Sequence, residues 1–147
     1  MKLNIKIFIL LTFITSATAY GCGGEYVVRS AEKADGTNVA IVVHESDFDG
    51  IPVWTPGEND PPLPLKTARE IALTWAQSEY LRYDRVEIST DSSLSMVGPI
   101  HCTSSEDNWL YIFDVVLVID GNLVSGVGNW VAVFMDGTTV GPIEMES

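Results

Sequence analysis

The chain has 147 residues, of which 46% are hydrophobic, and its 20 acidic and 8 basic side chains give a formal net charge of −12 at pH 7. The length fits one domain. The charge argues against nucleic acid and anionic membrane surfaces as partners, because both would repel it. It is compatible with a cationic partner, and equally with an acidic surface that only maintains solubility.

Residues 1–19 have the pattern of a secretory signal peptide. Two lysines give a positive start, an apolar run follows over residues 7–14, and small residues at 17–19 form a cleavage site. The apolar run is shorter than the ~20 residues that a membrane-spanning helix needs. We therefore expect an exported protein, secreted or periplasmic, that begins at Tyr20. Cleavage removes two lysines and no acidic residue, which changes the charge from −12 to −14.

The two cysteines, Cys22 and Cys102, are disulfide candidates in an oxidising compartment. Their bridge would close a loop of roughly 80 residues and stabilise the fold by ~4 kcal/mol in the loop-entropy picture. Gly21-Cys22 also resembles a bacterial lipoprotein cleavage site, although Ala19 and Tyr20 match that pattern poorly. A lipid on Cys22 would anchor the chain to the envelope and leave Cys102 as a free thiol.

Residues 25–29 and 39–43 predict two strands, and the turn-forming residues 34–38 between them complete a β-hairpin over residues 25–44. Residues 45–64 form an acidic loop rich in Gly and Pro, which we expect to be extended. Trp54 stands in this loop between two prolines. We expect it to pack into a surface groove of the domain, with contact to a ligand as the alternative.

The segment Glu45–Gly50 resembles the start of a calcium loop, because oxygen-bearing side chains alternate ahead of a glycine. Pro56 stands where the closing Glu would be, and a strand is predicted where a helix should precede the loop. A helix–loop–helix calcium site is therefore excluded. A looser calcium site in the Glu45–Asp49 loop and a simple solvated acidic loop both stay open.

Residues 65–83 predict the one clear helix. Its apolar face has helical spacing and consists of Ala68, Ile71, Ala72, Trp75 and Ala76. We expect Trp75 to be a core residue that packs on a sheet.

After the helix, residues 86–90 and 94–97 predict two short strands. Residues 109–119 predict a long strand that is apolar on both faces apart from Asp114, so we expect it to be covered on both sides. Asp120-Gly121 supplies the positive-φ residues of a tight hairpin. Glycines at 126 and 128 break the returning strand.

The returning strand resumes over residues 130–135, a second Asp-Gly turn follows at 136–137, and residues 138–143 form a short last strand. Alone among apolar neighbours, Asp114 is a candidate buried acid with a raised pKa. More often such a residue sits at a sheet edge or pairs with an arginine, and Arg82 and Arg85 are the candidate partners.

The order of elements predicts an α+β fold, in which one long helix packs on an antiparallel β-sheet after an N-terminal β-hairpin. We expect residues 20–147 to form a single domain. Within it, residues 20–64 hold the hairpin and the acidic Pro-rich loop, and residues 65–147 hold the helix and an antiparallel meander.

Motifs for chemistry are scarce. The chain has two histidines, His44 and His101, and lacks the sequence signatures of a nucleophile elbow, a phosphate loop and a zinc-protease helix. His101 and Cys102 are neighbours, and neighbouring side chains on a strand point to opposite faces. We therefore assign no catalytic, cofactor-binding or metal-binding residues and expect no cofactor.

Three stretches resemble a loosely defined group of small secreted bacterial proteins of unknown function: the helix with its Pro-Leu start, Trp109-Leu110-Tyr111, and the closing Val131–Thr138 segment with its Asp-Gly-Thr turn. The helix-then-meander layout is also similar to cystatin-like and PepSY-type domains. The resemblance covers roughly residues 60–143. It implies a roll of that type and a role in restraining proteases or in binding at the cell envelope.

These features lead us to expect an exported, non-catalytic domain that binds another exported or envelope protein through an edge strand or the Trp54 loop. One alternative is a small hydrolase-like enzyme that uses Asp114 with a histidine in a pocket between helix and sheet. The other is a passive structural protein.

Overall fold

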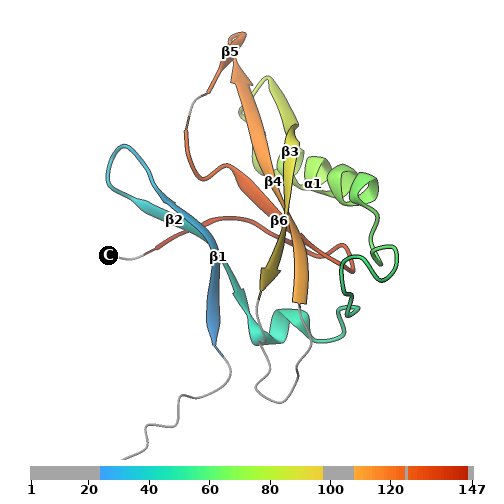
Figure 1. Cartoon of the computed structure of the whole chain (residues 1–147). Coiled ribbons are helices and arrows are strands. Elements are labelled where there is room, and N and C mark those ends of the chain that lie inside the picture. The colour runs from blue at the N-terminus through green and yellow to red at the C-terminus, as the bar shows by residue number, and fades with distance from the viewer. Residues whose placement is uncertain (1–23, 98–107, 125, 146–147) are drawn as a thin grey trace, which may run out of the picture.

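The computed structural model describes residues 24–97, 108–124 and 126–145. Within them the chain is α+β, with one α-helix and two antiparallel sheets (Figure 1). The α+β prediction is thus confirmed at that level. The elements are β1 (Glu25–Glu32), β2 (Asn38–His44), the 3-10 turn η1 (Glu45–Phe48), α1 (Leu65–Glu79), β3 (Arg85–Val97), β4 (Asn108–Ile119), β5 (Asn122–Leu123), β6 (Trp130–Phe134), β7 (Thr139–Val140) and β8 (Ile143–Glu144). None of the described helices has the length and apolar character that a membrane crossing requires.

The larger sheet has the strand order β3-β4-β6-β7, and β5 pairs with the end of β4. β4 is the long apolar strand, and it is central as its sequence predicts. Its hairpin with β5 turns at Asp120 and Gly121, which have φ angles of 50° and 75°, and Ile119 pairs with Asn122 across the turn. These positive φ angles are those of the predicted two-residue turn.

The smaller sheet has the order β1-β2-β8 and contains the predicted N-terminal hairpin. Its third strand comes from the far end of the chain. Residues 138–143 are predicted as one short strand, but two strands occur here: β7 pairs with β6 in the larger sheet, and β8 pairs with β2 in the smaller one. Pro142 lies between them, and the segment links the two sheets (Figure 1).

The two faces of β4 are covered by different layers, with α1 on one side and the β1–β2 hairpin on the other (Figure 1). The odd-numbered residues of β4 face α1. Three alanines of the helix, Ala68, Ala72 and Ala76, lie fully buried against them. Their small side chains let the helix approach the sheet closely. The even-numbered residues Leu110 and Ile112 join a second cluster with Val39, Ile41 and Val43 of β2. Cover on both faces explains why β4 is apolar on both.

Two element boundaries differ from prediction. The helix ends at Glu79, because Tyr80 leaves the helical conformation with φ −102° and ψ 44°. Residues 86–90 and 94–97, predicted as two strands, belong to the single strand β3. The polar residues between them do not end the strand: Ser92 and Ser93 pair with β4, and the register shifts between Ile88 and Ser92, where residues 89–91 form a bulge.

Candidate binding site

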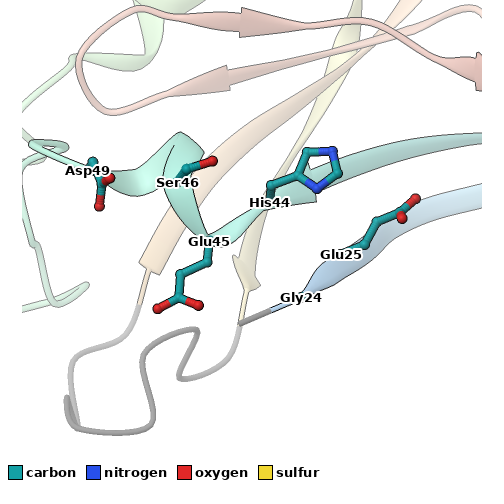
Figure 2. Close-up of a pocket in the computed structure, with 6 residues that line it drawn as sticks. All are labelled: Gly24, Glu25, His44, Glu45, Ser46 and Asp49. Carbon is teal, nitrogen blue, oxygen red and sulfur yellow. The ribbon is translucent and has the colours of Figure 1, made fainter. Parts of the chain in front are cut away.

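A solvent-open pocket of about 590 Å³ lies where β1 begins and β2 ends (Figure 2), and it is lined by Gly24, Glu25, His44, Glu45, Ser46 and Asp49. The residue types suggest chemistry, but the side chains do not converge. Glu45 extends away from the His44 imidazole and the Ser46 hydroxyl (Figure 2). A nucleophile needs its base within hydrogen-bond reach. The pocket does not show that arrangement.

The acidic residues beside this pocket shape the backbone. Asp47 Oδ2 accepts a hydrogen bond of 2.7 Å from the backbone N–H of His44, which fixes the entry into η1. In the described part of the chain, no group of three His, Cys, Asp or Glu side chains is placed to hold a metal ion. The looser calcium site considered for Glu45–Asp49 therefore has no such ligand set there.

A different site has converging side chains. It is a cleft of about 360 Å³ between β1, β3 and β4, which we call the inter-sheet cleft. It is lined by Val28 and Arg29 of β1, by Asp91, Ser92, Ser93 and Ser95 of β3, and by Ile112 and Asp114 of β4. Most of these side chains are polar, although the cleft lies between two sheets whose facing side chains are otherwise apolar.

Two β-bulges form the walls of the inter-sheet cleft. In β1 the pairing with β2 shifts between Val27 and Arg29, so Val28 is an extra residue. In β3 the pairing shifts between Ile88 and Ser92, which places residues 89–91 opposite the single residue Asp114. Bulges of this kind re-aim side chains and are frequent next to functional sites. Here two strands from different sheets bulge at the same cleft.

The central feature of the cleft is an ion pair. Arg29 Nη2 lies 3.0 Å from Asp114 Oδ1, and Arg29 Nη1 donates to Asp114 Oδ2 at 3.2 Å, a two-point contact of the kind that fixes orientation. The guanidinium carbon also lies 4.6 Å from the ring centroid of Trp130, the residue beside Asp114 in the sheet. The side chains are 35% and 42% exposed, so solvent or a ligand can reach the pair.

The structure corrects two expectations about Asp114. Its side chain is half-exposed rather than buried, and its partner is Arg29 rather than Arg82 or Arg85. Arg82 instead donates to the hydroxyl of Tyr83, and Arg85 pairs with Glu87 of its own strand. The physical reason is distance along the sheet: Arg85 pairs with Val118, four residues along β4 from Asp114, and Arg82 lies in the turn before β3, whereas Arg29 lies in the hairpin that covers this face of β4.

A second arginine, which the sequence did not predict as a site residue, supports the β3 wall of the cleft from the helix side of the sheet. Arg69 of α1 donates to the backbone carbonyls of Ser89 and, at 3.0 Å, Thr90, which are the first two residues of the β3 bulge. Its guanidinium carbon lies 5.7 Å from the ring centroid of Phe113. A bulge frees carbonyls from the sheet ladder, and Arg69 satisfies them. The helix therefore holds the bulge in place.

The other candidate residues lie elsewhere. Trp54 donates from Nε1 to the carbonyl of Asn59 at 3.0 Å, and its ring packs edge-on against Trp109 with 6.3 Å between centroids. It is partly buried beside the cluster under α1. Cys22, Cys102 and His101 lie outside the described residues, so the disulfide, the lipid anchor and the signal peptide stay predictions.

Comparisons of the chain with protein-family models, with characterised proteins and with solved structures found no match. The geometry of the site is therefore the basis for a functional assignment.

Proposed function

We propose that this protein is an exported, non-catalytic binding domain that takes up an extended segment of another exported protein. The segment pairs with the outer edge of β1 and places one side chain in the inter-sheet cleft. The observation that carries this proposal is the half-exposed Arg29–Asp114 pair inside an otherwise apolar layer. Apolar residues in place of an ion pair that is partly removed from solvent often leave a protein equally stable or more stable, so this pair is not required for folding and is available for recognition.

The edge of β1 supports strand pairing. Among the described strands only β2 pairs with β1, so the other edge of β1 has no strand partner in the described part of the chain. Such an edge can accept an added strand, whose main chain supplies affinity and whose side chains supply specificity. Val27 stands on β1 with 52% of its surface exposed and offers an apolar contact. A β-bulge can also serve to protect an edge strand from unwanted pairing. The bulge in β1 stands next to Arg29, whose side chain reaches Asp114, so it shapes the cleft as well.

The hydrolase alternative receives less support. It needs a pocket between helix and sheet in which Asp114 meets a histidine. The described interface between α1 and the sheet is filled with buried side chains. Asp114 lines the inter-sheet cleft, and His44 lines the separate pocket at the end of β2. The cleft therefore offers ionic and hydroxyl contacts to a ligand rather than a base beside a nucleophile.

The proposal includes two further parts, export of the protein and a cystatin-like or PepSY-like roll as its fold type. Export is supported by the signal-peptide pattern of residues 1–19. We further propose that α1 and the larger sheet form the cystatin-like or PepSY-like roll that the resemblance implies. What supports it is the helix that precedes an antiparallel meander and packs on its inner face. The passive structural alternative predicts that no surface of the protein has a specific partner.

Site-specific photo-crosslinking in the exporting cell tests the proposal. A photoreactive amino acid replaces Val27 on the β1 edge, and the matched control replaces Leu123, an aliphatic residue on β5 that is 70% exposed. We expect one discrete adduct from position 27 and none from position 123, with the cross-linked peptide of the partner identified by mass spectrometry. Equal labelling at both positions, or no adduct at either, would overturn the proposal.

A further inference from the structure

The outer side of α1 borders a second concave surface, a groove of about 470 Å³ between the helix and the turn that joins β6 to β7. The helix contributes residues one turn apart along a single face, and the turn contributes the opposite wall. The groove is lined by Thr67, Glu70, Ile71, Thr74, Trp75, Ser78, Gly137 and Thr139. From Thr67 to Ser78 the helix rises about 16 Å, so the groove is long enough for an extended ligand.

Trp75 lines this groove and packs closely against Gly141. A Cβ added at Gly141 would lie 2.4 Å from Trp75 Cζ2, so only glycine leaves room for the ring there. Gly141 has no left-handed φ angle, so its need for glycine comes from this contact. Tyr80 packs edge-on against the same ring, with 6.1 Å between centroids. The indole thus contacts Gly141 and Tyr80 and also lines the groove.

Three polar side chains of the helix, Glu70, Thr74 and Ser78, offer acceptors to the groove, and the hydroxyls of Thr67 and Thr139 can donate or accept. Thr74 Oγ1 donates its proton to the carbonyl of Glu70 at 3.0 Å, and Ser78 Oγ donates to the carbonyl of Trp75 at 2.6 Å. Each hydroxyl therefore has lone pairs left for a ligand but no free proton. The Glu70 carboxylate can only accept when ionised. No lysine or arginine is among the lining residues, so an anionic ligand would meet no opposite charge.

We propose that this groove binds a neutral oligosaccharide. A pyranose ring presents an apolar C–H face, which fits the indole of Trp75, and a rim of hydroxyls, which supply the donors that Glu70, Thr74 and Ser78 lack. A single cationic group would also suit an aromatic ring and a carboxylate. The spacing favours the oligosaccharide, because acceptors repeat at successive helical turns along the groove rather than surrounding one point.

The groove and the inter-sheet cleft lie on opposite sides of the larger sheet, since α1 covers one face and β1 the other. The groove proposal therefore does not rest on strand pairing at β1. A protein with both sites would connect an exported protein to a glycan.

NMR titration of the full mature protein tests the groove. The probes are chitotetraose, cellotetraose and maltotetraose, with choline as the cationic rival, and the readout is the Trp75 indole N–H signal. We expect one of the sugars to shift this signal saturably. Glu70→Gln should weaken that binding by about tenfold, the size of a lost charged hydrogen bond. Glu79→Gln, on the same helix outside the groove, should leave it unchanged.

Trp75→Leu should abolish the sugar response. Because this substitution also alters packing at Gly141, the Trp75→Leu variant can fail to fold. In that case the Glu70→Gln result decides. The proposal would be overturned by a shift with choline and none with the three sugars, or by no shift with any probe. Sugar binding that is equally strong in Glu70→Gln would also overturn it.

Discussion

The two faces of the larger sheet have different roles. On the helix side, β4 meets three fully buried alanines of α1, and the contact contains no ion pair among the described residues. On the hairpin side, the apolar cluster includes Leu110 and Ile112 but gives way at Asp114 to a polar cleft. One strand therefore has a fully apolar, closely packed face and a face with a polar cleft, to which we assign recognition of the proposed partner. Side-chain alternation keeps the two independent.

The largest effects should come from the aromatic residues that anchor the two faces. Phe113 lies fully buried on the helix side and Phe134 fully buried on the hairpin side. We expect Phe113→Ala and Phe134→Ala each to lower the free energy of unfolding by about 3–5 kcal/mol. Chemical denaturation followed by fluorescence and by circular dichroism should show one shared transition in both variants. A separate early transition in Phe134→Ala alone would mean that the small sheet unfolds independently.

The second prediction concerns close packing on the helix side. Gly141→Ala puts a methyl group against the ring of Trp75 and should destabilise the protein by about 1–3 kcal/mol, the usual cost of overpacking. Gly126→Ala is the matched control, because a Cβ there meets no atom within 4 Å and the backbone is not left-handed. Thermal unfolding of both variants provides the comparison. Equal midpoints for the two would show that the Trp75 ring is free to move.

The third prediction addresses the polar cleft on the hairpin side. The Arg29–Asp114 pair is partly solvated, so Arg29→Met alone should cost only about 0.5–1 kcal/mol. The double variant Arg29→Met/Asp114→Leu should be as stable as the wild type or more stable, because apolar side chains can extend the neighbouring cluster. Denaturant titration measures both. A loss of several kcal/mol in the double variant would assign the pair to folding rather than recognition.

The smallest effect belongs to the turn of the N-terminal hairpin. The backbone N–H of Thr37 donates to Asp35 Oδ1 at 2.9 Å, and this hydrogen bond, with a second from the Thr37 side chain, lowers the pKa of Asp35 below 3.8. Because the pKa of Asp35 is lower in the folded state than in the unfolded state, its ionised carboxylate stabilises the fold at any pH above the unfolded-state pKa. This contribution disappears as the pH falls through the folded-state pKa. The melting-temperature difference between wild type and Asp35→Asn should therefore be small at pH 7 and vanish once the pH has fallen below the lowered pKa of Asp35. A difference that grew on acidification would contradict the assignment.

The sequence predicted the local features of this fold well. The N-terminal hairpin, the helix start at Leu65, the Asp120-Gly121 turn and the doubly covered β4 all follow from short-range patterns of turn residues and alternation. Such patterns depend on neighbours a few positions apart, which the sequence displays directly.

What was missed depends on distant contacts. Arg29 and Asp114 are 85 positions apart, and nothing near either residue indicates the other. Residues 91–93 have the composition of a turn, so the first predicted strand ends at Thr90, but Arg69 of the helix satisfies the carbonyls of Ser89 and Thr90 and β3 continues through a bulge. The helix pattern gave no signal for the end at Glu79, because no glycine or proline follows it closely.

The most direct test of the central claim is the yield of the position-27 adduct in the Arg29→Met/Asp114→Leu background. Because this double variant should fold as stably as the wild type, a change in yield reports on recognition and not on folding. We predict that the adduct is lost while the free energy of unfolding is unchanged. An adduct of undiminished yield in a folded double variant would contradict the claim that the Arg29–Asp114 cleft recognises the partner.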